Sequence, residues 1–146
     1  MTKLNKIYLG KGILSLEGHY DDYDKIYVVG DIHGMYNRLM SLMNNFSLKD
    51  DDLLIFLGDY IDRGGDSALC MEYIKQLDSL PNVVALMGNH ELLLREYVKF
   101  NGMKGMELSF AKRNPFEPWI HSGGESTIKS LDDYNREGKN KFSLVK

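Results

Sequence analysis

Three short segments of the sequence place carboxylate, imidazole and amide side chains directly after a glycine. They are residues 30–34 (GDIHG), 58–64 (GDYIDRG) and 88–91 (GNHE). Carboxylate, imidazole and amide donors mixed in this way suit manganese, iron or zinc better than calcium. Two such ions, ~3.5–4 Å apart, can clamp the attacking and leaving oxygens of a phosphoryl displacement. They also lower the pKa of a bound water from about 15.7 toward ~7, so the pattern indicates hydrolytic metal chemistry.

The first two segments hold the residues that suit one ion. Asp31 and His33 lie two positions apart, so in extended backbone their side chains project to the same side and can bind one ion together. Asp59 belongs to the next segment and can place a carboxylate oxygen between two ions. A single Gly-Asp pair is usually only a turn, because both residues favour turns. Three such segments in one chain favour the metal-binding interpretation.

Four further side chains could bind a second ion, bind the phosphate or transfer a proton. Asn89 can offer its carbonyl oxygen to a second ion, and the adjacent His90 can then protonate a departing alkoxide. Asp62 can orient the imidazole of His90, and Arg63 carries a planar fork that matches phosphate oxygens. Taken alone, an Asp-Arg neighbourhood is more often a structural or solvated ion pair, and one histidine is more often structural.

The elements that must position these residues are short apolar strands. Residues 26–29, 53–57 and 83–87 are continuous apolar runs, which fit strands buried on both faces of a parallel sheet. Each run ends at one of the three segments. Ligands of open parallel sheets bind beyond the carboxyl ends of the strands, so the three segments should converge on one crevice.

Helical patterns separate the predicted strands. Apolar residues recur at helical spacing at Leu39, Leu42, Met43 and Phe46, and again at Cys70, Ile74 and Leu77. Asp66 or Ser67 can cap the second of these helices, and a third runs from near Glu91 through Leu94 and Val98. This alternation predicts an α/β layered domain. Residues 8–16 suggest an antiparallel strand or hairpin, whereas the pattern thins beyond Gly102, where prolines and paired glycines interrupt it.

Composition fits one globular domain. The chain has 146 residues, of which 43% are apolar, and its net charge of -3 gives no overall attraction to nucleic acid or to an anionic membrane. No apolar run approaches the length of a membrane span, so the expected location is cytoplasmic. The single cysteine, Cys70, excludes an intramolecular disulfide and is expected to be a small buried residue. His19 has no motif around it and is expected to be structural or exposed.

The three segments resemble the signature blocks of the phosphoprotein phosphatases, a branch of the calcineurin-like metallophosphoesterase superfamily. Residues 119–124 (WIHSGG) resemble a weaker motif of bacterial and phage members. The resemblance covers roughly Lys25 to Leu131. It implies an α/β fold that forms the N-terminal half (βαβαβα) of a two-sheet sandwich. The second half is missing, so residues 1–146 are expected to be a single truncated domain.

The resemblance also implies a role for each residue. Asp31, His33 and Asp59 would hold the first of two divalent ions, with Asp59 bridging and Asn89 reaching the second. The expected metal is manganese, with iron or zinc as alternatives. His90 would be the general acid, assisted by Asp62, while Arg63 and Asn89 bind the substrate phosphate. Metal-bound water would then attack phosphorus without a phosphoenzyme intermediate.

The second ion is expected to be bound weakly or not at all. Members of the family complete that site with two later histidines, and a later arginine assists phosphate binding. The only histidine after His90 is His121, which lies in neither of the histidine blocks and is not expected to be a ligand. Asp59 and Asn89 alone fall short of the three or four protein ligands usual for such a site.

These observations leave several functions open. The first is hydrolysis of phosphoric monoesters, on phosphoserine or phosphothreonine of proteins or on small phosphoesters. The same apparatus would serve a diadenosine tetraphosphate hydrolase. A third possibility is an inactive, truncated protein that binds a metal or a partner without turnover, and the incomplete second site makes this chain's own activity uncertain. A purely structural domain would bind no metal.

Overall fold

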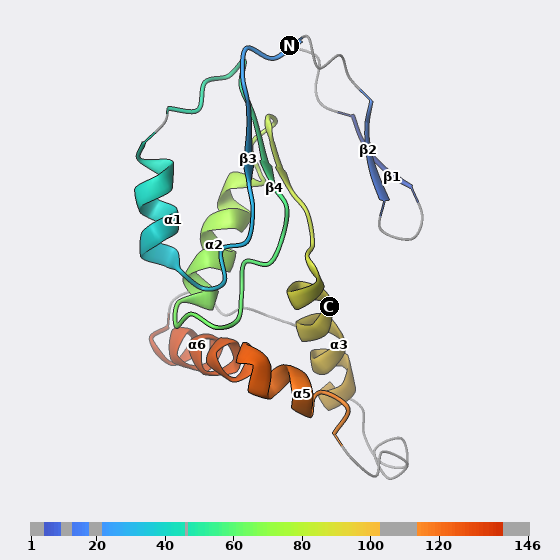
Figure 1. Ribbon diagram of the computed structural model, residues 1–146, viewed down its shortest axis with the longest axis vertical. Helices are drawn as coiled ribbons and strands as arrows, with labels where there is room; N and C mark the ends of the chain where they lie inside the picture. Colours follow the sequence, from blue (N-terminus) through green and yellow to red (C-terminus); the bar gives the residue numbers. More distant parts are fainter. Residues whose placement is uncertain (1–4, 10–12, 18–21, 46, 103–113, 139–146) are drawn as a thin grey trace.

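The computed structural model of the protein describes residues 5–9, 13–17, 22–45, 47–102 and 114–138 (Figure 1). The expectation for His19 lies outside these residues. β1 (Asn5–Leu9) and β2 (Ile13–Glu17) pair antiparallel, as the sequence suggested. Within the described ranges, no helix is both long enough and apolar enough to cross a membrane.

A three-stranded parallel sheet is the centre of the fold. It consists of β3 (Ile26–Val29), β4 (Leu53–Phe56) and β5 (Val83–Ala85), in the order β3-β4-β5. The last residues of the strands are in register, because Val29 pairs with Phe56 and Phe56 with Ala85. The predicted α/β class and all three strands are confirmed, and the three carboxyl ends lie together at one edge.

Helices α1 (Tyr36–Met43) and α2 (Ser67–Leu77) follow β3 and β4 and lie on the same side of the sheet (Figure 1). α3 (Asn89–Gly102) follows β5. Leu39 on α1 is buried, as predicted, but Leu42 is 44% exposed. α2 begins after Asp66, as predicted, although the Asp66 side chain makes no capping hydrogen bond.

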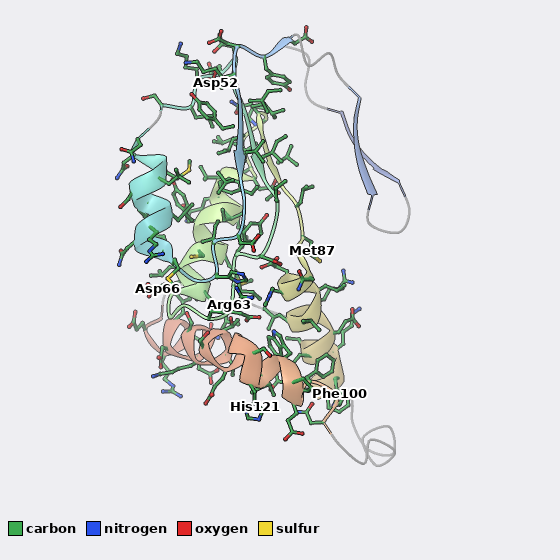
Figure 2. All side chains as sticks on the ribbon, viewed as in Figure 1. Asp52, Arg63, Asp66, Met87, Phe100 and His121 are labelled. Atoms are coloured by element: carbon green, nitrogen blue, oxygen red, sulfur yellow. The ribbon has the colours of Figure 1, made fainter. Side chains whose placement is uncertain are left out.

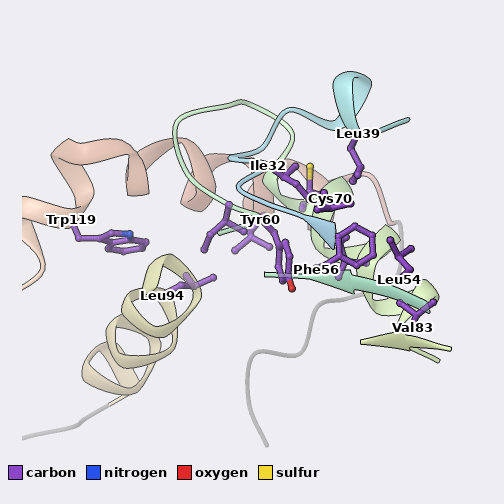
Figure 3. Close-up of a cluster of buried hydrophobic side chains, with 14 residues drawn as sticks. Ile32, Leu39, Leu54, Phe56, Tyr60, Cys70, Val83, Leu94 and Trp119 are labelled. Atoms are coloured by element: carbon purple, nitrogen blue, oxygen red, sulfur yellow. The ribbon is translucent and has the colours of Figure 1, made fainter. Parts of the chain in front are cut away.

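The main core lies between the sheet and the helices. Leu54, Phe56 and Val83 point from the strands into this core (Figure 3), and Val29 belongs to the same cluster. Cys70 on α2 is fully buried there, and burial, with a smaller contribution from Asp66, raises the pKa of its thiol to about 12. The thiol is therefore a packing group, as the sequence suggested.

The prediction that the strands are buried on both faces is wrong for β3. Ile26 and Val28 are 43% and 57% exposed. Both alternate with Val29, which is buried, because successive side chains of a strand point to opposite faces. β3 is therefore covered on one face only among the described residues. A short, wholly apolar run cannot distinguish these two cases, because periodicity is absent from it.

The segment after residue 113 forms structure that the sequence pattern did not predict. α5 (Glu117–Trp119) leads through the π-helical turn η2 (Ile120–Gly124) into α6 (Glu125–Arg136). α6 lies across the end of the sheet where the strands terminate (Figure 1). It also contacts α2, because the Ala68 N–H donates to the Ser130 hydroxyl at 3.1 Å.

Candidate functional site

The loops after β3 and β4 are joined by backbone hydrogen bonds. The N–H of His33 donates to the Asp59 carbonyl at 2.9 Å, and the N–H of Gly64 donates to the His33 carbonyl at 3.0 Å. The N–H of Asp66 donates to the Gly34 carbonyl at 3.1 Å. The predicted convergence of these two segments is therefore present, and it fixes the backbone on which the candidate ligands sit.

Glu91 joins the loop after β5 to the loop after β4. Its carboxylate accepts three backbone N–H groups, from Asp59 at 2.8 Å, Tyr60 at 2.7 Å and Gly88 at 2.9 Å. From the sequence, Glu91 was predicted only to lie near the start of a helix. Hydrogen bonds to an ionised acceptor are stronger than neutral ones, so this one side chain holds the two loops together.

Four residues of these loops adopt left-handed backbone conformations although none of them is glycine. The φ angles are +48° at His33, +55° at Asp59, +72° at Asp62 and +66° at Arg63. Such a conformation costs about 1–3 kcal/mol at each residue and is concentrated at functional sites. All four are residues to which the sequence assigned chemistry, so the strain supports that assignment.

The structure brings two residues predicted to bind metal, His33 and Asp59, close to His90, which was predicted to be the general acid. One ligand atom from each of His33, Asp59 and His90 lies within 4.8 Å of the others. Nδ1 of His33 lies 2.9 Å from the Ile61 carbonyl, so its proton sits on Nδ1 and Nε2 remains a free lone pair. A backbone carbonyl on the second ring nitrogen is the usual arrangement for a metal-binding histidine. This donor set fits a divalent transition metal.

Asp31 lies at the edge of this group, and Asn89 directly precedes His90 in the chain. Oδ2 of Asp31 is 3.5 Å from Nε2 of His33, so both can reach one ion, and the Asp31 side chain is 65% exposed. Asn89 is the first residue of α3 and is exposed. Of the residues proposed as ligands, Asp31, His33 and Asp59 thus lie on two joined loops, and Asn89 enters from the third.

The predicted pair of Asp62 and His90 is formed. Oδ2 of Asp62 lies 2.6 Å from Nδ1 of His90, and both residues are buried. The indole of Trp119 donates to the same oxygen at 2.6 Å, and the hydroxyl of Thr127 donates to the other oxygen at 2.6 Å. Neither Trp119 nor Thr127 was predicted as a site residue.

Arg63 is exposed at the edge of the site, where a phosphate could reach its guanidinium. Its N–H donates to the Gly123 carbonyl at 3.2 Å, so the 119–124 segment also supports this residue. Gly123 has a φ of +122°, and a Cβ there would lie 2.7 Å from the Arg63 nitrogen. His121 is exposed and lies on the opposite side of the α5–α6 ribbon from Arg63 (Figure 2).

Gly88 has no room for a side chain beside the candidate metal ligand. A Cβ at this position would lie 2.1 Å from Oδ1 of Asp59. We expect Gly88→Ala to destabilise the fold by about 1–3 kcal/mol, as overpacking does, and to weaken manganese binding because Asp59 must move. Gly65→Ala is the matched control, since a Cβ at Gly65 meets nothing within 4 Å. Urea unfolding and calorimetry measure both effects; equal behaviour of the two variants would contradict this expectation.

Comparison with known proteins places these features in context. Residues 24–144 match the family model described as calcineurin-like phosphoesterase. Serine/threonine-protein phosphatase 2 of Escherichia coli is 41% identical over 116 residues, which covers 79% of this chain and 45% of that protein. The symmetrical bis(5'-nucleosyl)-tetraphosphatase of Wigglesworthia glossinidia brevipalpis is 41% identical over 81 residues, covering 53% and 29%.

A solved structure is also similar. It is a protein serine/threonine phosphatase from Saccharomyces cerevisiae with similarity to human phosphatase PP5, with 27% identity and a TM-score of 0.39. The match covers 71% of this chain and 32% of that one. The chain thus spans less than half the length of each of these relatives.

Proposed function

The chain belongs to the calcineurin-like phosphoesterase family, and we propose that its site serves metal-dependent hydrolysis of phosphoric monoesters on phosphoserine or phosphothreonine. The observation that carries this proposal is the meeting of His33, Asp59 and His90 at the carboxyl ends of the sheet, with Asp62 behind the imidazole of His90. A cytoplasmic location remains a prediction of the sequence.

Asp31, His33 and Asp59 would hold one divalent ion, which we propose to be manganese, with iron or zinc as alternatives. Asp59 and Asn89 are the described residues proposed to reach a second ion. When bound, such ions polarise the phosphoryl oxygens and stabilise the charge that develops on them. The backbone hydrogen bonds between the loops after β3 and β4 hold His33 and Asp59 at a fixed separation before an ion binds.

The remaining steps belong to the side chains. Nδ1–H of His90 is held by Asp62, so the proton that the imidazolium form can pass to the departing alkoxide is the one on Nε2, and the Nδ1–H tautomer remains after the transfer. The exposed guanidinium of Arg63 can bind two phosphate oxygens at once, and Asn89 can donate to a third. These residues would orient the phosphorus while His90 protonates the leaving group.

The lengths of the matches favour a protein substrate. The match to the bacterial protein phosphatase extends over 79% of this chain, whereas the match to the tetraphosphatase extends over 53% at the same identity. A dinucleoside tetraphosphate is the second candidate substrate, because the tetraphosphatase is as identical to this chain over its match, at 41%, as the protein phosphatase is. A protein that binds metal or a partner without turnover is the third alternative.

Phosphate release distinguishes these functions. With manganese, we expect the chain to release phosphate slowly from a phosphoserine peptide, because only Asp59 and Asn89 are proposed to reach a second ion. Chelation should stop the release, and added manganese should restore it. Diadenosine tetraphosphate, assayed in parallel, should give fewer nucleotide products. Manganese binding by calorimetry without phosphate release from either substrate would contradict the proposal and favour the binding protein.

A further inference from the structure

The carboxylate of Asp62 is fully buried and both of its oxygens accept hydrogen bonds. Oδ2 accepts from Nδ1 of His90 and from the indole of Trp119, each at 2.6 Å. Oδ1 accepts from the hydroxyl of Thr127 at 2.6 Å. Two of these three donors come from the segment after residue 113, which is far from Asp62 in the sequence.

The direction of the hydrogen bonds around Thr127 follows from its single proton. Its hydroxyl accepts the Asp62 N–H at 2.8 Å and donates to Oδ1 of the same residue. Because that proton is used, the hydroxyl of Ser67, 3.0 Å away, must be the donor to Thr127. Thr127 thus binds Asp62 through both the backbone and the side chain.

A buried carboxylate is stable only when hydrogen bonds replace its lost water. Asp62 also has a strained φ of +72°, so its backbone conformation needs support from its surroundings. Trp119 and Thr127 approach the two oxygens from α5 and α6, which fixes the plane of the carboxylate. The ring of His90 follows this plane, because its Nδ1–H must point at Oδ2.

We propose that Trp119 and Thr127 are positioning residues, which hold Asp62 so that His90 keeps its proton on Nδ1 and turns Nε2 toward His33 and Asp59. His90 and His33 meet edge to face, with ring centroids 4.8 Å apart. This inference rests on the proposed function, where His90 is the general acid. It makes α5 and α6 part of the catalytic apparatus, although neither contacts the substrate in that proposal.

A second hydroxyl on α6 provides a control that distinguishes positioning of Asp62 from packing of α6 on α2. Ser130 lies one turn after Thr127 and also bonds across to α2, where it accepts the Ala68 N–H at 3.1 Å. Among the described residues, the hydrogen bonds of the Asp62 side chain come from His90, Trp119 and Thr127 and not from Ser130. Ser130→Ala therefore removes an α2–α6 hydrogen bond without changing the carboxylate, and is the matched control for Thr127→Val.

The test is proton NMR of the metal-free, full chain labelled with ¹⁵N histidine. Wild type should show a sharp Nδ1–H signal for His90 and the Nδ1-protonated tautomer. In Thr127→Val that proton should exchange with water at least about tenfold faster, the factor for losing one hydrogen bond to a charged group, and the tautomers should mix. Thr127→Ser should restore the signal, and Ser130→Ala should keep it.

Trp119→Phe keeps an aromatic ring but lacks the indole N–H, so it provides a second test if Thr127→Val does not fold. It should also speed exchange of the His90 proton. A wild-type signal in either folded variant, or an equal change in Ser130→Ala, would overturn the proposal. The NMR readout needs no turnover, so it stands apart from failure of the proposed function. Where hydrolysis is measurable, Thr127→Val should lower kcat and leave KM unchanged.

Discussion

Asp59→Asn should lower the affinity of the chain for manganese by at least about 100-fold, more than the 10–100-fold lost when only an outer partner is removed. Asp59 lies within 4.8 Å of the ligand atoms of His33 and His90, and it is the residue proposed to contact both ions. Loss of its charge therefore affects each ion at once, and phosphate release should fall to the metal-free rate.

The fold of Asp59→Asn should survive. Oδ1 of Asp59 accepts the His90 N–H at 3.1 Å, and an asparagine carbonyl can accept the same hydrogen bond. The φ of +55° at this position suits asparagine at least as well as aspartate. The substitution should thus remove the negative charge at this position and leave the fold unchanged.

Thermal unfolding with and without manganese measures this loss. At a manganese concentration of about 100 Kd, wild type should gain about 2.7 kcal/mol, whereas Asp59→Asn should gain almost nothing. Asp51→Asn is the control, because Asp51 is an exposed carboxylate that precedes β4 at the other end of the sheet. An equal gain in Asp59→Asn and wild type would exclude Asp59 as a ligand.

Glu91→Gln should destabilise the chain by about 2–4 kcal/mol, because the carboxylate accepts three backbone N–H groups from two loops. Glutamine has one carbonyl oxygen, and its NH₂ would face the remaining donors. With the carbonyl in the place of Oε2, Asp59 and Gly88 keep their acceptor and the Tyr60 N–H faces the NH₂; in the reverse orientation Asp59 and Gly88 lose theirs. Either orientation disturbs the backbone at or next to Asp59, so manganese affinity should fall as well. Urea unfolding and calorimetry measure the two effects.

Glu96→Gln makes the same chemical change on the same helix. Glu96 pairs with Lys99 and Arg95 at the surface. The hydrogen bond with Lys99 makes the largest contribution to lowering the pKa of its carboxyl, and Arg95 lowers it further. Exposed pairs of this kind contribute little, so its unfolding midpoint should match wild type. If Glu91→Gln behaved in the same way, the two loops would be held by their own backbone bonds instead.

The part of the site that local sequence patterns could predict is the part built by consecutive residues. Each apolar run ends at a segment such as 58–64, and parallel pairing then brings the ends together, as β3, β4 and β5 do. The pairing of Asp62 with His90 followed from chemistry, because an imidazole that acts as an acid needs a carboxylate behind it. At these positions the local sequence pattern and the chemistry of the side chains pointed to the same residues.

The supports of the site could not be predicted in this way. Trp119 and Thr127 reach Asp62 across 57 and 65 positions of sequence, and only the tertiary packing of α5 and α6 creates these contacts. A signal for α6 was present, because Ile128, Leu131 and Tyr134 recur every three residues. The interruptions before it concealed that periodicity. Glu91 was missed because three backbone donors converge on it only after the loops have met.

The four left-handed residues set a limit on how this chain can be engineered. A stability-driven design that considered backbone preference alone would replace His33, Asp59, Asp62 and Arg63 with glycine, because glycine adopts a positive φ without a steric penalty. Each replacement would remove a side chain that is proposed to bind metal, bind phosphate or position the general acid. At these loops the optima for thermostability and for chemistry therefore diverge, and consensus or design protocols need to hold these four positions fixed.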